Sequence, residues 1–191
     1  MVRFVQMGSG LTRIVAGVVL AVLSGCTPDV VVPPSPAEVF RDTSAQIASQ
    51  TDVTAARMAG TWFIRQRLGG ISQKFDTLTL NVLPDDALQL AVTLGSCDQG
   101  VCEVKEHLIL LARTGPGRWT PRNPPGFWPP QDIWVMWMDF DSRTAAIGTP
   151  SGEFGWIMDK NPTGGRDRIV AARDVMEWFG YDMARLREVR P

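Results

Sequence analysis

Three short strand-like segments between Asp132 and Pro162 constrain the fold of this chain more than any other feature. They are Ile133–Phe140, Thr144–Gly148 and Phe154–Met158. Turn-forming residues separate them, at 141–143 and 149–152. A parallel crossover needs a dozen or more residues, so breaks this short predict consecutive antiparallel hairpins. The stretch is therefore interpreted as an up-and-down meander.

The segments upstream predict more strands of the same kind. Apolar and polar residues alternate over Asp76–Val82 and again over Leu88–Leu94, with the turn residues Pro84-Asp85-Asp86 between them. This alternation is typical of half-buried antiparallel strands. Val101–Arg113 predicts a further strand, polar in its first half and apolar in its second. Gly115–Gln131 is rich in proline and aromatic residues, which favours a packed loop or a rim over an opening.

A helix is predicted after the meander. Thr163 is the expected N-cap and Gly180 the expected stop. The apolar residues that recur at helical spacing are Ile169, Ala172, Met176 and Phe179. We expect this helix to cover the outside of the sheet, because Ile133–Phe140 is apolar on both of its faces.

The first residues look like an export signal. Arg3 and Arg13 accompany the apolar run Ile14–Leu23, which is shorter than the ~20 residues that a membrane span needs. The run ends in Leu23-Ser24-Gly25-Cys26, which resembles the lipobox of bacterial lipoproteins. The resemblance implies cleavage after residue 25 and a lipid on Cys26. A plain signal peptide with an incidental cysteine is the alternative.

The lipobox also implies a location and a domain plan. Lipoproteins held at the inner membrane often have aspartate after the cysteine, whereas Thr27 here favours the outer membrane, facing the periplasm. Residues 26–51 are rich in proline and alanine and are interpreted as a tether. Residues 52–191 are left as one folded domain.

Cys97 and Cys102 flank a predicted turn at 98–101. Paired cysteines of an exported protein usually oxidise, and facing positions of a hairpin bring their β-carbons within disulfide range. A Cys97–Cys102 disulfide is therefore expected. A metal site is the rival interpretation, but two thiolates fall short of the usual four ligands, so no metal is predicted.

Several motifs together resemble bacterial outer-membrane lipocalins, the group related to apolipoprotein D. The matching segments are Gly60-Thr61-Trp62-Phe63, Trp134-Val135 with Asp139, Ala146–Ser151, and Trp156-Ile157-Met158 through Pro162. The resemblance covers about Asp52 to Val189. It implies an all-β fold with a C-terminal flanking helix: an eight-stranded antiparallel up-and-down β-barrel around an apolar cavity.

The same resemblance implies roles for individual residues. Gly60 and Trp62 would begin the first strand, with the tryptophan at the closed end of the barrel under a basic side chain. This sequence has Lys160 where the family has arginine, so the flat stacking of a guanidinium is lost. The proline-rich Gly115–Gln131 is a second departure, and it leaves the fifth and sixth strands open.

Strand alternation nominates the side chains that would line the cavity. They are Leu78, Leu80, Val82, Leu90, Val92, Trp134, Met136 and Met138. The opposite set, Ile133, Val135 and Trp137, would lie under the helix. Methionine and tryptophan give a pliable apolar wall. The alternative is a barrel that its own side chains fill completely.

The predicted function is binding of a hydrophobic molecule or lipid, such as a fatty acid or lysophospholipid, in the cell envelope. A charged head is expected near the rim, by Arg118 or Arg122. The alternatives are a structural lipoprotein with a filled barrel and an enzyme of lipocalin fold. No enzyme is predicted, because the single histidine, His107, has no partner placed by sequence. No cofactor is expected. The net charge is −1 and there is no long basic run, so no nucleic-acid partner is expected. The oligomeric state is left open.

Overall fold

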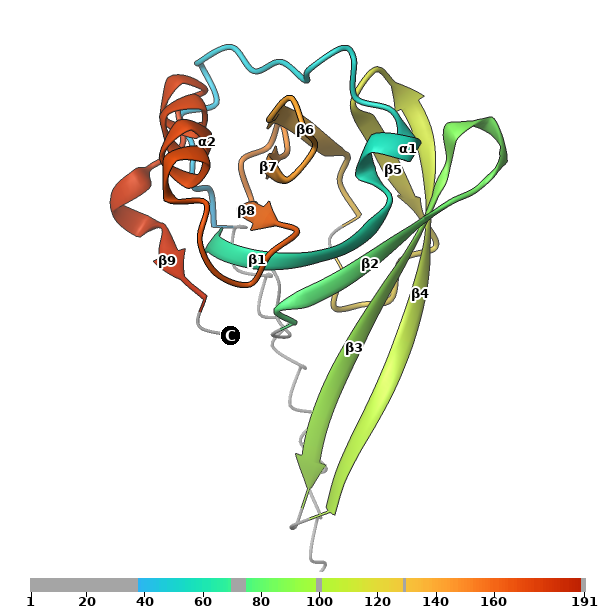
Figure 1. The fold of residues 1–191 in the computed structure, drawn as a ribbon. Helices are drawn as coiled ribbons and strands as arrows, with labels where there is room; N and C mark the ends of the chain where they lie inside the picture. Colours follow the sequence, from blue (N-terminus) through green and yellow to red (C-terminus); the bar gives the residue numbers. More distant parts are fainter. Residues whose placement is uncertain (1–37, 70–74, 99–100, 129, 190–191) are drawn as a thin grey trace, which may run out of the picture. The chain divides into compact units, whose positions relative to one another are not determined.

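The computed structural model of the chain describes residues 38–69, 75–98, 101–128 and 130–189. Eight antiparallel strands follow one another around a barrel, and β1 pairs with both β2 and β8, which closes it (Figure 1). The strands are β1 (Gly60–Leu68), β2 (Thr77–Val82), β3 (Leu88–Asp98), β4 (Val101–Gly115), β5 (Arg118–Arg122), β6 (Ile133–Met138), β7 (Thr144–Gly148) and β8 (Gly155–Asp159). The predicted eight-stranded up-and-down barrel is confirmed, and the fifth and sixth strands, which sequence reasoning leaves open, are both present.

The remaining elements lie around the barrel. The helices are α1 (Ala55–Met58), α2 (Arg166–Trp178) and the single 3-10 turns η1 (Pro84–Asp86) and η2 (Met183–Arg185). A two-residue strand, β9 (Arg187–Glu188), pairs with β1 at Gln66 and Arg67. In the part of the chain that the structure describes, no helix is long and apolar enough to cross a membrane.

The up-and-down order gives the barrel two different ends. The connections β2–β3, β4–β5 and β6–β7 share one end, which α1 also adjoins through the hydrogen bond from the Ala55 amide to Asp86. We call this the closed end. The connections β1–β2, β3–β4, β5–β6 and β7–β8 share the opposite end, which we call the open end.

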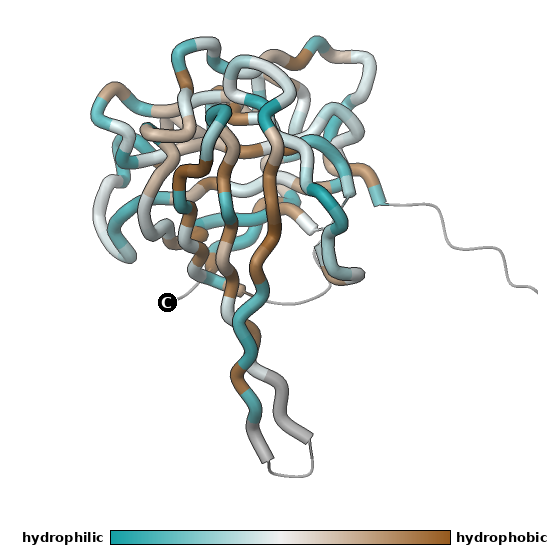
Figure 2. The backbone as a smooth tube through the Cα atoms, turned by 90° about the vertical axis from the view of Figure 1, so that its right-hand side faces the viewer, coloured by the Kyte–Doolittle hydropathy of each residue, from teal (hydrophilic) through white to brown (hydrophobic). Residues whose placement is uncertain are grey.

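The hairpin β3–β4 is much longer than its neighbours and projects beyond the open end (Figures 1 and 2). Its unbroken register runs from Leu88 opposite Leu111 to Asp98 opposite Val101. Cys97 and Cys102 stand directly opposite each other in this register, as the predicted disulfide requires.

The disulfide remains a prediction, and peptide mapping tests it. We expect a Cys97–Cys102 linked peptide in protein purified from an oxidising compartment, since directly opposed positions need little backbone movement to bond. Two thiols that alkylate freely without prior reduction would refute the pairing. Because the bond closes a very short loop, its loss should cost little stability.

Helix α2 covers the outside of β6, β7 and β8, as predicted. Ile169, Ala172 and Met176 form its buried face. Its C-terminus is a Schellman motif, in which the Gly180 amide donates to the Glu177 carbonyl and the Tyr181 amide to that of Met176. Gly180 has φ +86°, so the expected stop is confirmed. The expected N-cap is wrong: the cap is Gly165, because the chain turns through two left-handed glycines after Thr163 and enters the helix later.

Residues 38–51, which the sequence assigns to the tether, pack against the barrel. The Phe40 amide donates to Gly152, and Arg41 is buried, where its guanidinium donates to the carbonyls of Phe179 (3.1 Å) and Pro150 (2.7 Å). Farther along, the Gln50 amide donates to Val135. The folded unit therefore begins at least as early as residue 38, and the signal segment and Cys26 lie outside the described residues.

Candidate functional site

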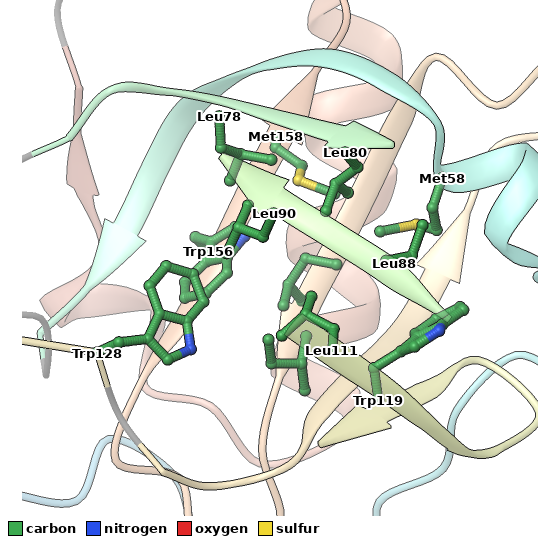
Figure 3. Close-up of a pocket in the computed structure, with 12 residues that line it drawn as sticks. Met58, Leu78, Leu80, Leu88, Leu90, Leu111, Trp119, Trp128, Trp156 and Met158 are labelled. Atoms are coloured by element: carbon green, nitrogen blue, oxygen red, sulfur yellow. The ribbon is translucent and has the colours of Figure 1, made fainter. Parts of the chain in front are cut away.

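The interior of the barrel holds a small apolar cavity (Figure 3). Twelve side chains line it: Met58, Leu78, Leu80, Leu88, Leu90, Leu111, Trp119, Trp128, Ile133, Ile147, Trp156 and Met158. Its volume is about 20 Å³, measured as the space open to the centre of a water-sized sphere. By that measure a single water needs about 10–15 Å³, so the side chains fill the barrel almost completely.

The residues nominated from alternation divide into three groups. Leu78, Leu80 and Leu90 line the cavity, and Val92 and Met138 belong to the same interior core without lining it. Val82 is 50% exposed at the end of β2, so its nomination is wrong. Trp134 and Met136 are also misplaced: they lie outside the barrel.

A β-bulge in β6 explains the error at Trp134 and Met136. The register with β7 shifts between Val135 and Trp137, so Met136 is an extra residue. Ile133 and Val135 before the bulge face the interior, whereas Met136 and Trp137 pack on the outer cluster beneath α2. Strict alternation puts Ile133 and Val135 under the helix, which is wrong, and it places Trp137 there correctly.

The closed end is built around Trp62. Its indole is fully buried, and its N–H donates to the Met58 carbonyl at 2.7 Å. The Lys160 ammonium lies 5.0 Å from the centre of the indole ring, the contact that the family resemblance implies. Burial lowers the pKa of Lys160, and the nearby charge of Asp139 opposes that shift. Gly60 begins β1 with φ +107°, a conformation that favours glycine.

The side chains of five aromatic residues cover the open end, and we call them the aromatic cap. Phe127 and Trp128 come from the proline-rich loop between β5 and β6, and Phe75, Phe154 and Trp156 come from around the barrel. Trp128 stacks on Phe75 at 5.5 Å between ring centres and meets Trp156 edge-on at 6.0 Å. Trp156 in turn stacks on Phe154 at 5.1 Å. Gly115–Gln131, for which the alternatives are a packed loop and a rim over an opening, therefore contains strand β5 and a loop after it whose Phe127 and Trp128 are packed.

Three buried N–H donors at the open end have no partner among the described residues. They are the Nε of Arg67 and the indole Nε1 atoms of Trp128 and Trp156. Figure 3 shows both indoles among the side chains that line the cavity. Trp119, which lines the other side of the same cavity, instead donates its indole N–H to the Asp86 carbonyl at 3.0 Å. A buried N–H donor without a partner costs about 1–3 kcal/mol in an apolar interior.

Arg67 joins this group because of a second bulge. The register of β1 with β8 shifts between Ile64 and Gln66, which leaves Arg67 directly opposite Trp156 on the same face of the sheet. The Nη2 atom of Arg67 donates to Asp76 and to the Phe75 carbonyl, both at 2.6 Å. Burial lowers the pKa of Arg67, while its bond to Asp76 opposes the shift.

Arg67 is a functional candidate that alternation alone misses, and it replaces the two rim arginines that the sequence nominates. Arg118 lies outside the barrel, with its guanidinium 3.9 Å from the centre of the Trp134 ring and its Nε donating to Ser49. Arg122 is exposed, opposite Leu110 on the outer side of β4. Neither faces the cavity.

Nothing in the described part of the chain assembles a catalytic or metal-binding group around His107. Its imidazole meets the Phe127 ring edge-on, with 4.8 Å between ring centres, so it supports the aromatic cap. Within those same residues there is no cluster of three or more His, Cys, Asp or Glu side chains that could hold a metal ion.

Comparison with known proteins supports the architecture and does not reach a family. No family model matches the chain, and no curated protein matches its sequence. Among solved structures it is similar to a major allergen of cockroaches, Per a 4, with a TM-score of 0.57 over 78% of this chain and 96% of that one. The two chains are 9% identical, so the likeness concerns the fold. The chain has a lipocalin-like fold: a closed eight-stranded antiparallel barrel with one C-terminal helix.

Proposed function

We propose that the protein binds one slender hydrophobic molecule inside its barrel, such as a fatty acid or the acyl chain of a lysophospholipid. The observation that carries this proposal is an interior lined by apolar side chains and covered at one end by a group of loop side chains. That group is the pair Phe127 and Trp128, which belong to a loop and not to a strand. Within the loop, the Trp128 amide donates to Pro125, and the Gln131 side chain donates to Glu153.

The narrow cavity limits what can bind. Ligand pockets usually measure about 300–1,000 Å³, far more than the space present here. An acyl chain therefore enters only when side chains of the wall change rotamer. Met58 and Met158 are suited to this, because methionine has three rotatable bonds and adapts to irregular space. A single alkyl chain is the ligand shape that asks for the least rearrangement.

Titration of fatty acids and lysophospholipids into delipidated protein tests the proposal. Three of the lining side chains are tryptophans, so binding should change the intrinsic emission. Leu90→Phe enlarges a side chain that lines the cavity, and we expect it to weaken binding about tenfold or more. Overpacking of this kind typically costs about 1–3 kcal/mol of stability, so the melting temperature is measured in parallel.

Leu108→Phe is the matched control, because Leu108 lies on the exposed outer face of β4. It should change neither binding nor stability. Equal affinities for Leu90→Phe and wild type would place the ligand outside the barrel and overturn the proposal.

The cavity volume favours a second candidate, a structural envelope protein with a filled barrel. Side chains that already occupy nearly all of the interior are what this candidate expects. The titration separates the two. If no lipid class binds below about 100 µM, an affinity of roughly −5.5 kcal/mol, the filled barrel is the better description.

We further propose that a lipid on Cys26 anchors the protein to the outer membrane of a bacterial envelope, facing the periplasm. The sequence Leu23-Ser24-Gly25-Cys26 after an apolar run supports this. Stable anchoring takes two or more acyl chains, whereas one chain gives marginal binding. Cys26→Ala should therefore move the protein from the membrane fraction to the soluble fraction. A variant that stays wholly in the membranes would refute lipidation at Cys26, and separated inner and outer membranes test the location.

A further inference from the structure

We propose that Arg67, Trp128 and Trp156 form a binding site for the acyl oxygen of the ligand, the carboxylate of a fatty acid or the ester carbonyl of a monoacyl lipid. The inference rests on the proposed function and adds the ligand's chemical class and orientation. The acyl oxygen lies at the open end, under the aromatic cap. The hydrocarbon chain runs from there towards Trp119 and Met58 at the other side of the cavity (Figure 3).

The side chains that carry the three donors are linked by strand register and by ring contacts. Arg67 and Trp156 occupy directly opposed positions of β1 and β8, so their side chains project from the same face. The Arg67 guanidinium is 6.0 Å from the centre of the Phe75 ring, and that ring stacks on Trp128. Trp128 meets Trp156 edge-on. These contacts link donors from three separate segments, and the proposal places the acyl oxygen among them.

Two other indoles inside the barrel have hydrogen-bond partners, whereas that of Trp134, outside the barrel, has none among the described residues. Trp62 donates to the backbone carbonyl of Met58 in α1, and Trp119 donates to that of Asp86 in η1. Trp128 and Trp156 are also buried, at 3% exposure each, and have no such carbonyl among the described residues. Because an unpaired buried donor is unfavourable, a site whose two indoles and guanidinium Nε have no partner in the described part of the chain is suited to an acceptor that arrives with the ligand.

The charges at the site fit an acyl oxygen of either kind. Arg67 is the cation of the site and can stabilise a carboxylate by a charge-assisted hydrogen bond. Asp76 pairs with the Nη2 of Arg67 and offsets its charge, while the Nε has no partner among the described residues. A neutral ester carbonyl can therefore accept from the Nε as well. A lipid that lacks an acyl oxygen leaves all three donors unpaired and should bind more weakly.

A matched pair of lipids tests the inference in full-length delipidated protein. One is an acyl lysophosphocholine, and the other is the 1-O-alkyl lysophosphocholine of the same chain length, which replaces the ester by an ether. We expect the acyl lipid to bind about tenfold more tightly, the size of one or two neutral hydrogen bonds. A fatty acid and the alkane of equal length form a second pair, which reports on the carboxylate.

Substitutions assign the preference to the donors. Trp156→Phe keeps an aromatic ring in the cap and removes the N–H, so the ratio of acyl to ether affinity should fall towards one. Arg67→Met should reduce the preference for the fatty acid over the alkane more strongly than the preference for the ester. Trp178→Phe, at an 83% exposed indole on α2, is the control and should leave both ratios unchanged.

The outcomes separate this inference from the function on which it rests. Equal binding of acyl and ether lipids in wild type would keep the ligand-binding barrel and overturn the acyl-oxygen site, with water as the partner of the three donors. An acyl preference that persists in both Trp156→Phe and Arg67→Met would also overturn it. If neither lipid pair binds, the proposed function fails as well.

Discussion

Replacing Trp62 with alanine is expected to lower the free energy of unfolding by about 3–5 kcal/mol. The indole is fully buried in a closely packed interior, so its removal leaves a cavity. The substitution also removes the hydrogen bond that ties the Met58 carbonyl, at the end of α1, to the first strand. Urea or thermal unfolding monitored by circular dichroism measures the loss, provided that unfolding is two-state.

Trp178→Ala is the matched control, because it removes the same side chain from the exposed face of α2. It should change the free energy of unfolding by less than about 0.5 kcal/mol. Lys160→Arg should be neutral or mildly stabilising, since a guanidinium can stack on the indole more closely than an ammonium. A Trp62→Ala protein with the wild-type melting temperature would contradict the role of Trp62 at the closed end.

The strands and the outer helix could be predicted because their signals are local. The alternation of Leu78 and Leu80 with polar neighbours decides which face of β2 is buried. Short turns can join neighbouring strands only as antiparallel pairs, so the strands follow one another in up-and-down order. The helical spacing of Ile169, Ala172 and Met176 predicts the face of α2 that packs on the barrel.

The orientation of side chains beyond a bulge could not be predicted in this way. A bulge adds one residue to a strand and reverses its inward and outward faces, and nothing in the residues of β6 distinguishes Met136 as the extra one. The same event in β1 hides Arg67, which alternation from Trp62 and Ile64 would place on the outer face. The candidate acyl-oxygen site depends on that second bulge.

The free space inside the barrel is also beyond sequence reasoning. Strand alternation nominates apolar side chains for the interior but does not show how much of the space inside the barrel those side chains fill. Here Phe127 and Trp128 enter from a loop that carries no periodic pattern, and they occupy the open end. The proline and aromatic content of Gly115–Gln131 indicates a packed loop, whereas the identity of the rings that it packs against follows only from the fold.

Breaking the buried ion pair of Arg168 and Asp159 is the second large effect that we expect, again about 3–5 kcal/mol. Asp159, at the end of β8, has no solvent exposure, and Arg168, on α2, is 16% exposed. The Nη2 atom of Arg168 donates to Asp159 at 2.9 Å, and its Nε donates to the Thr144 hydroxyl at 2.8 Å. That hydroxyl donates in turn to the same carboxylate at 2.5 Å. The three side chains join helix α2 to two strands of the barrel.

Arg168→Met keeps the length of the side chain and removes its charge, so the Asp159 carboxylate is left buried without a cation. The cost lies in this uncompensated charge more than in the pair itself, because desolvation offsets much of the attraction in a buried pair. The double variant Arg168→Met/Asp159→Asn should therefore recover part of the loss, and a double-mutant cycle measures how much. The exposed ion pair of Arg143 and Asp141 provides the control: Asp141→Asn should cost at most about 1 kcal/mol. If Arg168→Met is as mild as Asp141→Asn, α2 is held to the barrel by its apolar face alone.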